Sequence, residues 1–146
     1  MKIFVTKAFI VAALAAPSLI SAAEIKGLNV LMTSADAQTQ MMGMVLGGSV
    51  LNEQKKVLSI TLCGPAGNLA LKDSVAVDVK KPDGTVTNPK AALQGLIKAG
   101  AVVTVCPLFL PNAGKDTSAL AEGITVAKPP MVAKSLTDAE FNNISF

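Results

Sequence analysis

Short apolar runs and segments with helical spacing alternate along the chain from residue 24 onward. Four apolar runs lie at 26–35, 55–63, 101–106 and 123–128, and a short fifth run lies at 142–146. Runs that are apolar at nearly every position are typical of parallel strands buried on both faces. The alternation predicts an α/β fold, a three-layer sandwich with a mostly parallel sheet and helices on both faces.

The segment after the first strand has the spacing of a helix that packs on this sheet. Ser34 or Asp36 is expected to cap its amino end. Gly43 and Gly47 permit a close approach to the sheet, and the methionines are interpreted as adaptable core filler. The apolar positions expected to recur along this helix are Met41, Met42, Val45, Leu46 and Val50.

A second helix is predicted to begin at Asn88, with a proline in its first turn, and to end near Lys98. Shorter helices are expected at 68–72 and 117–122, and a further helix or turn at 129–141. Two polar or punctuated segments, 72–88 and 106–116, are predicted to be loops because turn-forming residues interrupt them.

Residues 1–23 are predicted to be a secretory signal peptide. Two lysines precede a charge-free apolar stretch, and Ser21 and Ala23 provide the small residues of a cleavage site before Glu24. Pro17 interrupts the stretch, which is short for a membrane span. We therefore expect a periplasmic protein that does not stay in the membrane after cleavage, with residues 24–146 forming one domain.

The composition excludes several kinds of chemistry. All basic side chains are lysines, and histidine, arginine, tryptophan and tyrosine are absent. A Ser-His or Cys-His pair, an imidazole metal site and a bidentate guanidinium clamp are therefore excluded, and we expect neither a metal nor an organic cofactor. Without the leader, 11 lysines face 10 acidic residues, which argues against a nucleic-acid partner.

Cys63 and Cys106 are the two cysteines, and each follows a predicted strand. If the first strand is central, with these two strands on either side of it, the reversal of strand order lies beside Cys106. Cys106 then faces Thr33, Ser34 and the amino end of the first helix, a setting that favours a thiolate. Lys115, in the following loop, adds a positive charge.

Two other interpretations of the cysteines stay open. A thiol at the end of an apolar strand is commonly a small, inert side chain, and residue type alone favours that interpretation for Cys106 and still more for Cys63. An exported protein with two cysteines often forms a disulfide. In the assumed strand order, however, the two cysteines lie about 10 Å apart, too far for that bond without movement of a loop.

The sequence resembles the DsrE/DsrF-like proteins of the YchN-like fold over nearly all of residues 24–146. The likeness lies in "LNVLMTSAD", in "KVLSITLCGPAGNLAL" and above all in "LQGLIKAGAVVTVCPLFLPNAG", followed by "LAEGITVAKPPMVAKSL". The resemblance implies a three-layer α/β domain that forms trimers or hexamers. It also implies that Cys106 carries sulfur as a persulfide, as the equivalent cysteine does in sulfur-relay members, although "CPLFLPN" has neither the second cysteine nor the arginine that such members often show near it.

The leading hypothesis is therefore a periplasmic sulfur carrier or sulfurtransferase-like protein that works with a sulfur donor or acceptor protein. The alternative is a non-catalytic, oligomeric binding or assembly module with structural cysteines. A thiol peroxidase is less well supported, because the chain lacks the arginine that commonly assists a peroxidatic cysteine. The residues leave open whether the protein is an enzyme or a stoichiometric carrier.

Overall fold

The computed structural model describes residues 24–146, so the expected signal peptide at 1–23 lies outside the described residues. The strands are β1 (Gly27–Met32), β2 (Val57–Leu62), β3 (Val79–Lys80), β4 (Val86–Thr87), β5 (Val102–Val105), β6 (Ile124–Val126) and β7 (Phe141–Ser145). The α-helices are α1 (Ala37–Gly48), α2 (Pro89–Lys98), α3 (Phe109–Asn112) and α4 (Pro129–Leu136). A π-helical turn at Ser49–Glu53 and 3₁₀ helices at Gly64–Ala70 and Thr117–Ala119 complete the described elements.

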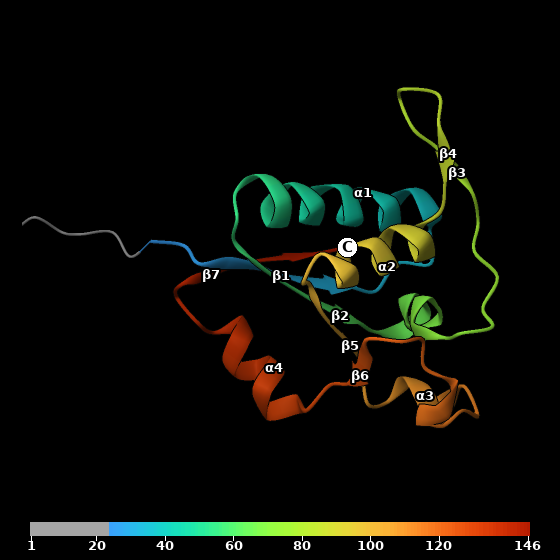
Figure 1. Cartoon of the computed structure of the whole chain (residues 1–146). Coiled ribbons are helices and arrows are strands. Elements are labelled where there is room, and N and C mark those ends of the chain that lie inside the picture. Colours follow the sequence, from blue (N-terminus) through green and yellow to red (C-terminus); the bar gives the residue numbers. More distant parts are fainter. Residues whose placement is uncertain (1–23) are drawn as a thin grey trace, which may run out of the picture.

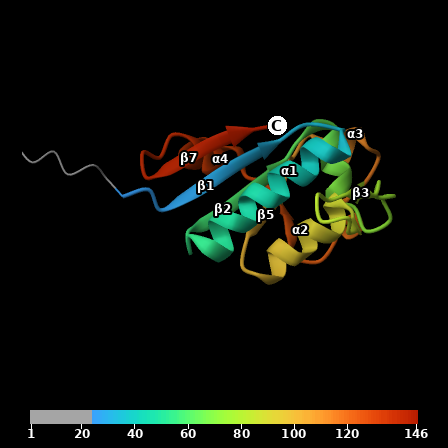
Figure 2. The same ribbon diagram turned by 90° about the horizontal axis from the view of Figure 1, so that it is seen from above.

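The main sheet has the strand order β6-β5-β2-β1-β7, and every neighbouring pair in it is parallel. Helices α1 and α2 lie on one face of this sheet, and α4 lies on the other (Figures 1 and 2). This arrangement confirms the predicted three-layer α/β architecture. It also shows that the assumed strand order was wrong, because β2 and not β1 occupies the centre.

The strand order follows from where the last strand pairs. The chain adds β2, β5 and β6 one after another on the same side of β1, and α4 then returns it to the opposite side. There β7 pairs with β1, with Gly27 beside Phe141 and Leu31 beside Ser145. The apolar patterns of β1 and β2 are equally continuous, so they do not indicate which strand is central.

The core lies between the sheet and helices α1 and α2. Fully buried side chains project from three neighbouring strands and from α2; they are Met32, Leu58, Ile60, Leu62, Val105 and Leu93. Their burial removes apolar surface from water on one face of the sheet, which is the main favourable term in folding. Met41 and Met44 of α1 complete this layer, in agreement with the prediction that methionines fill the core.

Helix α1 packs on the sheet through Gly43, Gly47 and Met41, as predicted, but three of the other predicted apolar positions do not face the sheet. Gly43 and Gly47 face Met32 and Leu58, and a Cβ at Gly47 would lie 2.9 Å from a methyl group of Leu58. This close approach turns the predicted positions Met42, Val45 and Leu46 outward, with 53%, 50% and 41% of their surface exposed. Of the two candidate caps, Asp36 accepts the hydrogen bond from the Thr39 backbone N–H at 2.8 Å.

Helix α2 begins as the sequence predicts, since the Asn88 side chain accepts a hydrogen bond from the Ala91 N–H at 2.9 Å. The segment before it differs from the predicted loop because β3 and β4 form an antiparallel hairpin that projects from the body of the protein (Figure 1). The segment 106–116 likewise contains α3. The strands of the hairpin have two residues each and α3 has four, which is too short to leave a periodic pattern in the sequence.

Helix α4 is held on the sheet by a buried polar network. Asn29 of β1 is only 4% exposed; its amide donates to the Ser135 carbonyl at 2.8 Å and to Asn143 Oδ1 at 2.9 Å. The Ser135 hydroxyl donates back to Asn29 Oδ1 at 2.8 Å. Because each buried polar atom of Asn29 has a partner, the side chain fixes α4 and β7 relative to β1.

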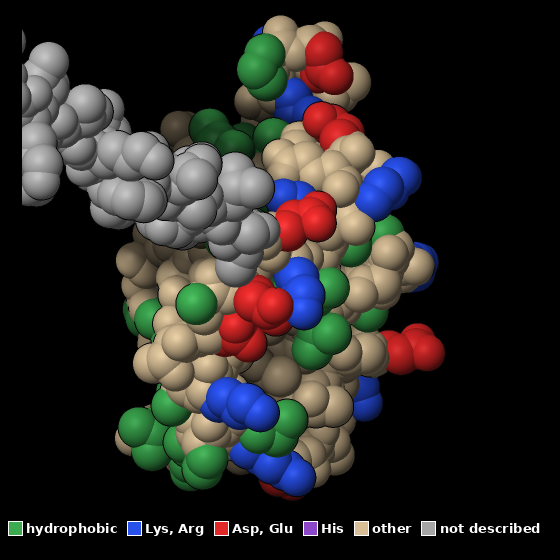
Figure 3. Space-filling view, turned by 90° about the vertical axis from the view of Figure 1, so that its left-hand side faces the viewer, with side chains coloured by type: hydrophobic (Ala, Val, Ile, Leu, Met, Phe, Trp, Pro, Cys, Tyr) green, Lys and Arg blue, Asp and Glu red, His purple; other side chains and the backbone are tan. Residues whose placement is uncertain are grey.

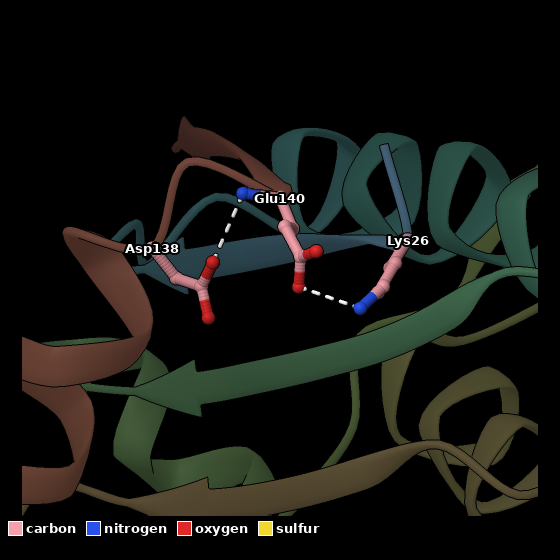
Figure 4. A network of polar contacts seen from close by, with 3 residues as sticks. All are labelled: Lys26, Asp138 and Glu140. Atoms are coloured by element: carbon pink, nitrogen blue, oxygen red, sulfur yellow. Dashed lines mark hydrogen bonds and ion pairs between the residues drawn. The ribbon is translucent and has the colours of Figure 1, made fainter. Parts of the chain in front are cut away.

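An exposed ion pair joins the starts of β1 and β7. Lys26 Nζ lies 2.7 Å from Glu140 Oε2, and the Glu140 N–H donates to Asp138 Oδ1 at 2.9 Å (Figure 4). Acidic and basic side chains lie intermixed on the side where the strands begin (Figure 3). Exposed ion pairs such as Lys26–Glu140 contribute little to stability.

None of the helices within residues 24–146 has the length and apolar character needed to cross a membrane.

Candidate functional site

Cys63 and Cys106 lie side by side at the carboxyl ends of β2 and β5. The register pairs Leu62 with Val105, and each cysteine is the next residue along its strand. The Cys106 N–H donates to the Leu62 carbonyl at 2.8 Å, and the Cys63 N–H donates to the Met32 carbonyl at 2.8 Å. The parallel ladder therefore continues through both cysteines, whose thiols are free and partly buried.

The strand periodicity places both thiols on the face of the sheet opposite α1 and α2. Leu62 and Val105 point into the core, so the residues on either side of them point to the other face. Two residues before the cysteines, the hydroxyl oxygens of Thr61 and Thr104 lie 3.3 Å apart on that face. The cysteines are the next neighbouring pair in the same two rows of side chains.

The segments that follow the two cysteines pack against each other. Gly67, in the 3₁₀ helix after Cys63, lies against the ring of Phe109 in α3, which follows Cys106. A Cβ at Gly67 would meet three atoms of that ring at less than van der Waals distance. Gly64 begins the 3₁₀ helix with φ of 53°, a left-handed backbone conformation that favours glycine. These two glycines allow both segments to turn sharply beside the thiols.

Cys106 lines an open hollow of about 550 Å³ between these two segments. The other lining residues are mainly apolar or small; they are Gly64, Pro65, Asn68, Leu108, Phe109, Asn112 and Ala113. Cys106 therefore borders a space that is open to solvent. Cys63 is not among the residues that line this hollow.

The two thiols interact electrostatically. The pKa of Cys63 is raised from 9.0 to about 12, chiefly because burial disfavours its thiolate. Its hydrogen bond to Cys106 and the negative charge of an ionised Cys106 add to the increase. Cys63 therefore keeps its proton near neutral pH and acts as the hydrogen-bond donor of the pair.

The structure does not bring together all the groups that the sequence placed around Cys106. Because β2 lies between β1 and β5, the neighbour of Cys106 is Cys63, whereas Thr33 and Ser34 lie one strand farther away. Lys115 lines a separate hollow of about 380 Å³ together with Asp73. The distance argument against a disulfide is also wrong, because the two cysteines belong to adjacent strands.

The sequence contains a signal for the pairing of the cysteines, which the assumed strand order did not take into account. Residues 60–63 read Ile-Thr-Leu-Cys and residues 103–106 read Val-Thr-Val-Cys, so each strand ends in threonine, an aliphatic residue and cysteine. The structure pairs these segments in register, Ile60 with Val103 and Thr61 with Thr104.

Within residues 24–146, no group of three or more His, Cys, Asp or Glu side chains is arranged to hold a metal ion.

Comparison with known proteins gives a result at the level of fold. No family model matches the chain, and no curated protein matches it in sequence. Among solved structures, the ychN protein from E. coli matches with a TM-score of 0.63 and 19% identity, over 82% of this chain and 99% of that one. A protein of unknown function, MTH1491 from Methanobacterium thermoautotrophicum, matches with a TM-score of 0.56 and 15% identity, over 82% and 97% of the two chains.

These likenesses extend over almost the full length of both solved chains, and they agree with the parallel five-stranded sheet and its helical layers. The fold implied by the sequence resemblance is thus confirmed: residues 24–146 have the YchN-like fold.

Proposed function

We propose that this protein is a sulfur carrier that holds sulfane sulfur as a persulfide on Cys106. The observation that carries the proposal is the position of Cys106, a free thiol at the carboxyl end of β5 that lines an open hollow. Ligands of open parallel sheets collect at the carboxyl ends of strands. The resemblance to sulfur-relay proteins supports the same cysteine.

The chemistry needs only the thiol and its immediate surroundings. The Cys106 thiolate attacks a sulfur atom of a polysulfide or the outer sulfur of a donor persulfide and forms a new S–S bond to it. The donor's own S–S bond breaks, and a shorter polysulfide anion or the donor's thiolate leaves with the electron pair. The bound sulfur later passes to the thiolate of an acceptor, which restores Cys106. The protonated Cys63 lies next to the sulfur atom of Cys106 and donates a hydrogen bond to it, which helps to hold a negatively charged persulfide in place.

Mass spectrometry tests this proposal directly. The reduced protein is incubated with inorganic polysulfide, treated with an alkylating agent and analysed intact and after digestion, with Cys106→Ser and Cys63→Ser in parallel. We expect one or more added sulfur atoms on Cys106 in the wild type or in Cys63→Ser, and none in Cys106→Ser. Sulfur loading that is equal in Cys106→Ser contradicts the proposal.

We further propose that the protein is exported to the periplasm and works there with exported thiol proteins as sulfur donors or acceptors. The support is the predicted signal peptide at 1–23. The protein recovered from a periplasmic fraction is expected to begin at Glu24. A protein that keeps its first residues and stays in the cytoplasmic fraction contradicts export.

Self-assembly is the third element of the proposal, and it is also what the alternative function, a binding or assembly module, requires. Helix α1 carries no charged residue and exposes Met42, Val45 and Leu46, an apolar surface of the kind found at protein interfaces. We expect a trimer or hexamer by light scattering, and we expect Val45→Glu to lower the oligomer mass. If assembly persists in Cys106→Ser while sulfur loading is absent from every variant, the assembly module becomes the better description.

A further inference from the structure

The relative placement of Cys63 and Cys106 has a chemical consequence beyond sulfur carriage. Directly paired residues on neighbouring strands lie about 4.8 Å apart. This spacing falls within the Cα separation of about 4.4–6.8 Å that disulfides span. The continuous ladder through both residues and the same-face contact of Thr61 with Thr104 place the two sulfurs next to each other.

We propose that Cys63 is a resolving thiol, which displaces the outer sulfur of a Cys106 persulfide as hydrosulfide and leaves a Cys63–Cys106 disulfide. The inference rests on the proposed sulfur loading of Cys106. It adds to carriage a second reaction, the reduction of sulfane sulfur to sulfide. Two cysteines with this arrangement form a two-electron redox site that neither forms alone.

The atoms and electrons of the step balance within the site. Cys63 Sγ forms a bond to Cys106 Sγ, and the bond between Cys106 Sγ and the outer sulfur breaks with its electron pair on the outer sulfur. Cys63 releases its thiol proton and the departing sulfur takes up one proton, so that hydrosulfide leaves. The outer sulfur gains two electrons, and the two cysteine sulfurs lose two as they become a disulfide.

A dithiol reductant returns the site to its starting state. It attacks one sulfur of the Cys63–Cys106 bond, forms a mixed disulfide and then closes its own disulfide, which releases both cysteines as thiols. Cys106 is the sulfur that an outside thiol meets, because it lines the open hollow whereas Cys63 does not. The reductant is therefore expected to form its mixed disulfide with Cys106.

The environment of Cys63 slows this internal reaction, because burial raises the pKa of the attacking thiol. Because Cys63 holds its proton near neutral pH, only a small fraction is present as the attacking thiolate. An acceptor thiol with an ordinary pKa has a larger thiolate fraction and therefore competes with Cys63 for the sulfur. Resolution by Cys63 then removes sulfur that has met no acceptor.

The test follows sulfur after loading. Reduced wild type, Cys63→Ser, Cys106→Ser and the double variant are loaded with inorganic polysulfide, freed of excess reagent, and incubated without reductant at pH 7 and pH 9. Released sulfide is trapped with a bimane reagent, and intact mass is recorded over time. Circular dichroism and thermal unfolding of each variant check that the serine substitutions leave the fold intact.

In the wild type, we expect the species with one added sulfur to convert to a species two hydrogens lighter than the reduced protein, with one sulfide released for each disulfide. Conversion is expected to be faster at pH 9 than at pH 7. The added sulfur is expected to persist at least about tenfold longer in Cys63→Ser, because the resolving thiol is absent. Peptide mapping is expected to find the new bond between Cys63 and Cys106.

Two results overturn the inference, and they have different meanings. If Cys63→Ser loads sulfur but the wild type keeps its added sulfur equally long and forms no disulfide, resolution is wrong and sulfur carriage stands. If no variant that retains Cys106 takes up sulfur, the proposed carrier function fails together with the resolution that depends on it.

Discussion

The ring of Phe109 packs directly against Gly67, and this contact joins the two segments that carry the chain away from Cys106 and Cys63. Neither segment has a long helix or strand of its own: one is a 3₁₀ helix and the other a four-residue helix. Their mutual packing is what gives the hollow beside Cys106 a defined wall.

Gly67→Ala is expected to disturb this wall. The new methyl group overlaps the Phe109 ring, and such overpacking costs about 1–3 kcal/mol. Urea unfolding is expected to show the loss, together with a changed alkylation rate of Cys106. The matched control is Gly95→Ala on the solvent-exposed side of α2, where a Cβ meets nothing within 4 Å; it is expected to stabilise the protein by about 0.5–1 kcal/mol. Equal stability of the two variants contradicts the packing argument.

The pH dependence of thiol alkylation is expected to differ between the folded and unfolded protein. Because the folded pKa of Cys63 is about 12, its alkylation rate is expected to keep rising as the pH increases from 9 toward 12. In urea the rise is expected to level off near pH 9, the ordinary value. Rates for each cysteine are read by mass spectrometry after digestion.

The same shift has a consequence for stability, because a raised folded pKa favours the protonated thiol. The contribution of Cys63 to stability is therefore fully present below about pH 9 and is lost as the pH rises toward 12. In Cys106→Ser, the pKa of Cys63 is expected to fall part of the way, since the Cys106 charge and hydrogen bond are lost while the burial remains. A Cys63 alkylation profile identical in the wild type and Cys106→Ser contradicts the coupling of the two thiols.

Removing the Asn29 side chain is expected to loosen α4. Asn29→Ala removes the three hydrogen bonds that join buried Asn29 to Ser135 and Asn143, which costs about 1–3 kcal/mol. Hydrogen exchange of α4 amides and urea unfolding measure the effect. Asn142→Ala, a control on the exposed side of β7, is expected to change stability by less than about 0.5 kcal/mol.

Asn29→Asp tests the same network through pH. The new carboxyl faces a carbonyl oxygen in a buried position, so its folded pKa is expected to lie above the ordinary value. A raised folded pKa means that the variant loses stability as the pH rises through the unfolded value of about 4 toward the folded one. A variant that is equally stable at pH 4 and pH 7 contradicts the buried donor role of Asn29.

The amino-terminal cap of α2 is the feature that the sequence specifies most directly, and its loss is expected to be measurable. Asn88→Ala removes the acceptor for the Ala91 N–H and is expected to lower stability by about 1 kcal/mol. Asn88→Ser keeps a capping oxygen and is expected to stay close to the wild type. Thermal unfolding of the two variants side by side checks this.

The sequence by itself determined the local features of this protein. Short runs rich in apolar and β-branched residues specified the parallel strands, and the positions that face α1 and α2 are buried in the structure. Asn88 specified the start of α2, because its side chain reaches the free backbone N–H groups of the first turn. The fold class followed from these elements, and the position of Cys106 at a strand end followed from the run before it.

The tertiary structure decided which strands are neighbours and which sides face inward. Apolar runs of equal strength cannot rank β1 and β2 for the centre; that choice depends on β7 pairing with the free edge of β1. The inward side of α1 depends on how closely Gly47 approaches Leu58. The pairing of Cys63 with Cys106 follows from the adjacency of their strands. The shared Thr-aliphatic-Cys ending of the two strands agrees with this pairing, but a short motif does not determine which strands become neighbours in the assembled sheet.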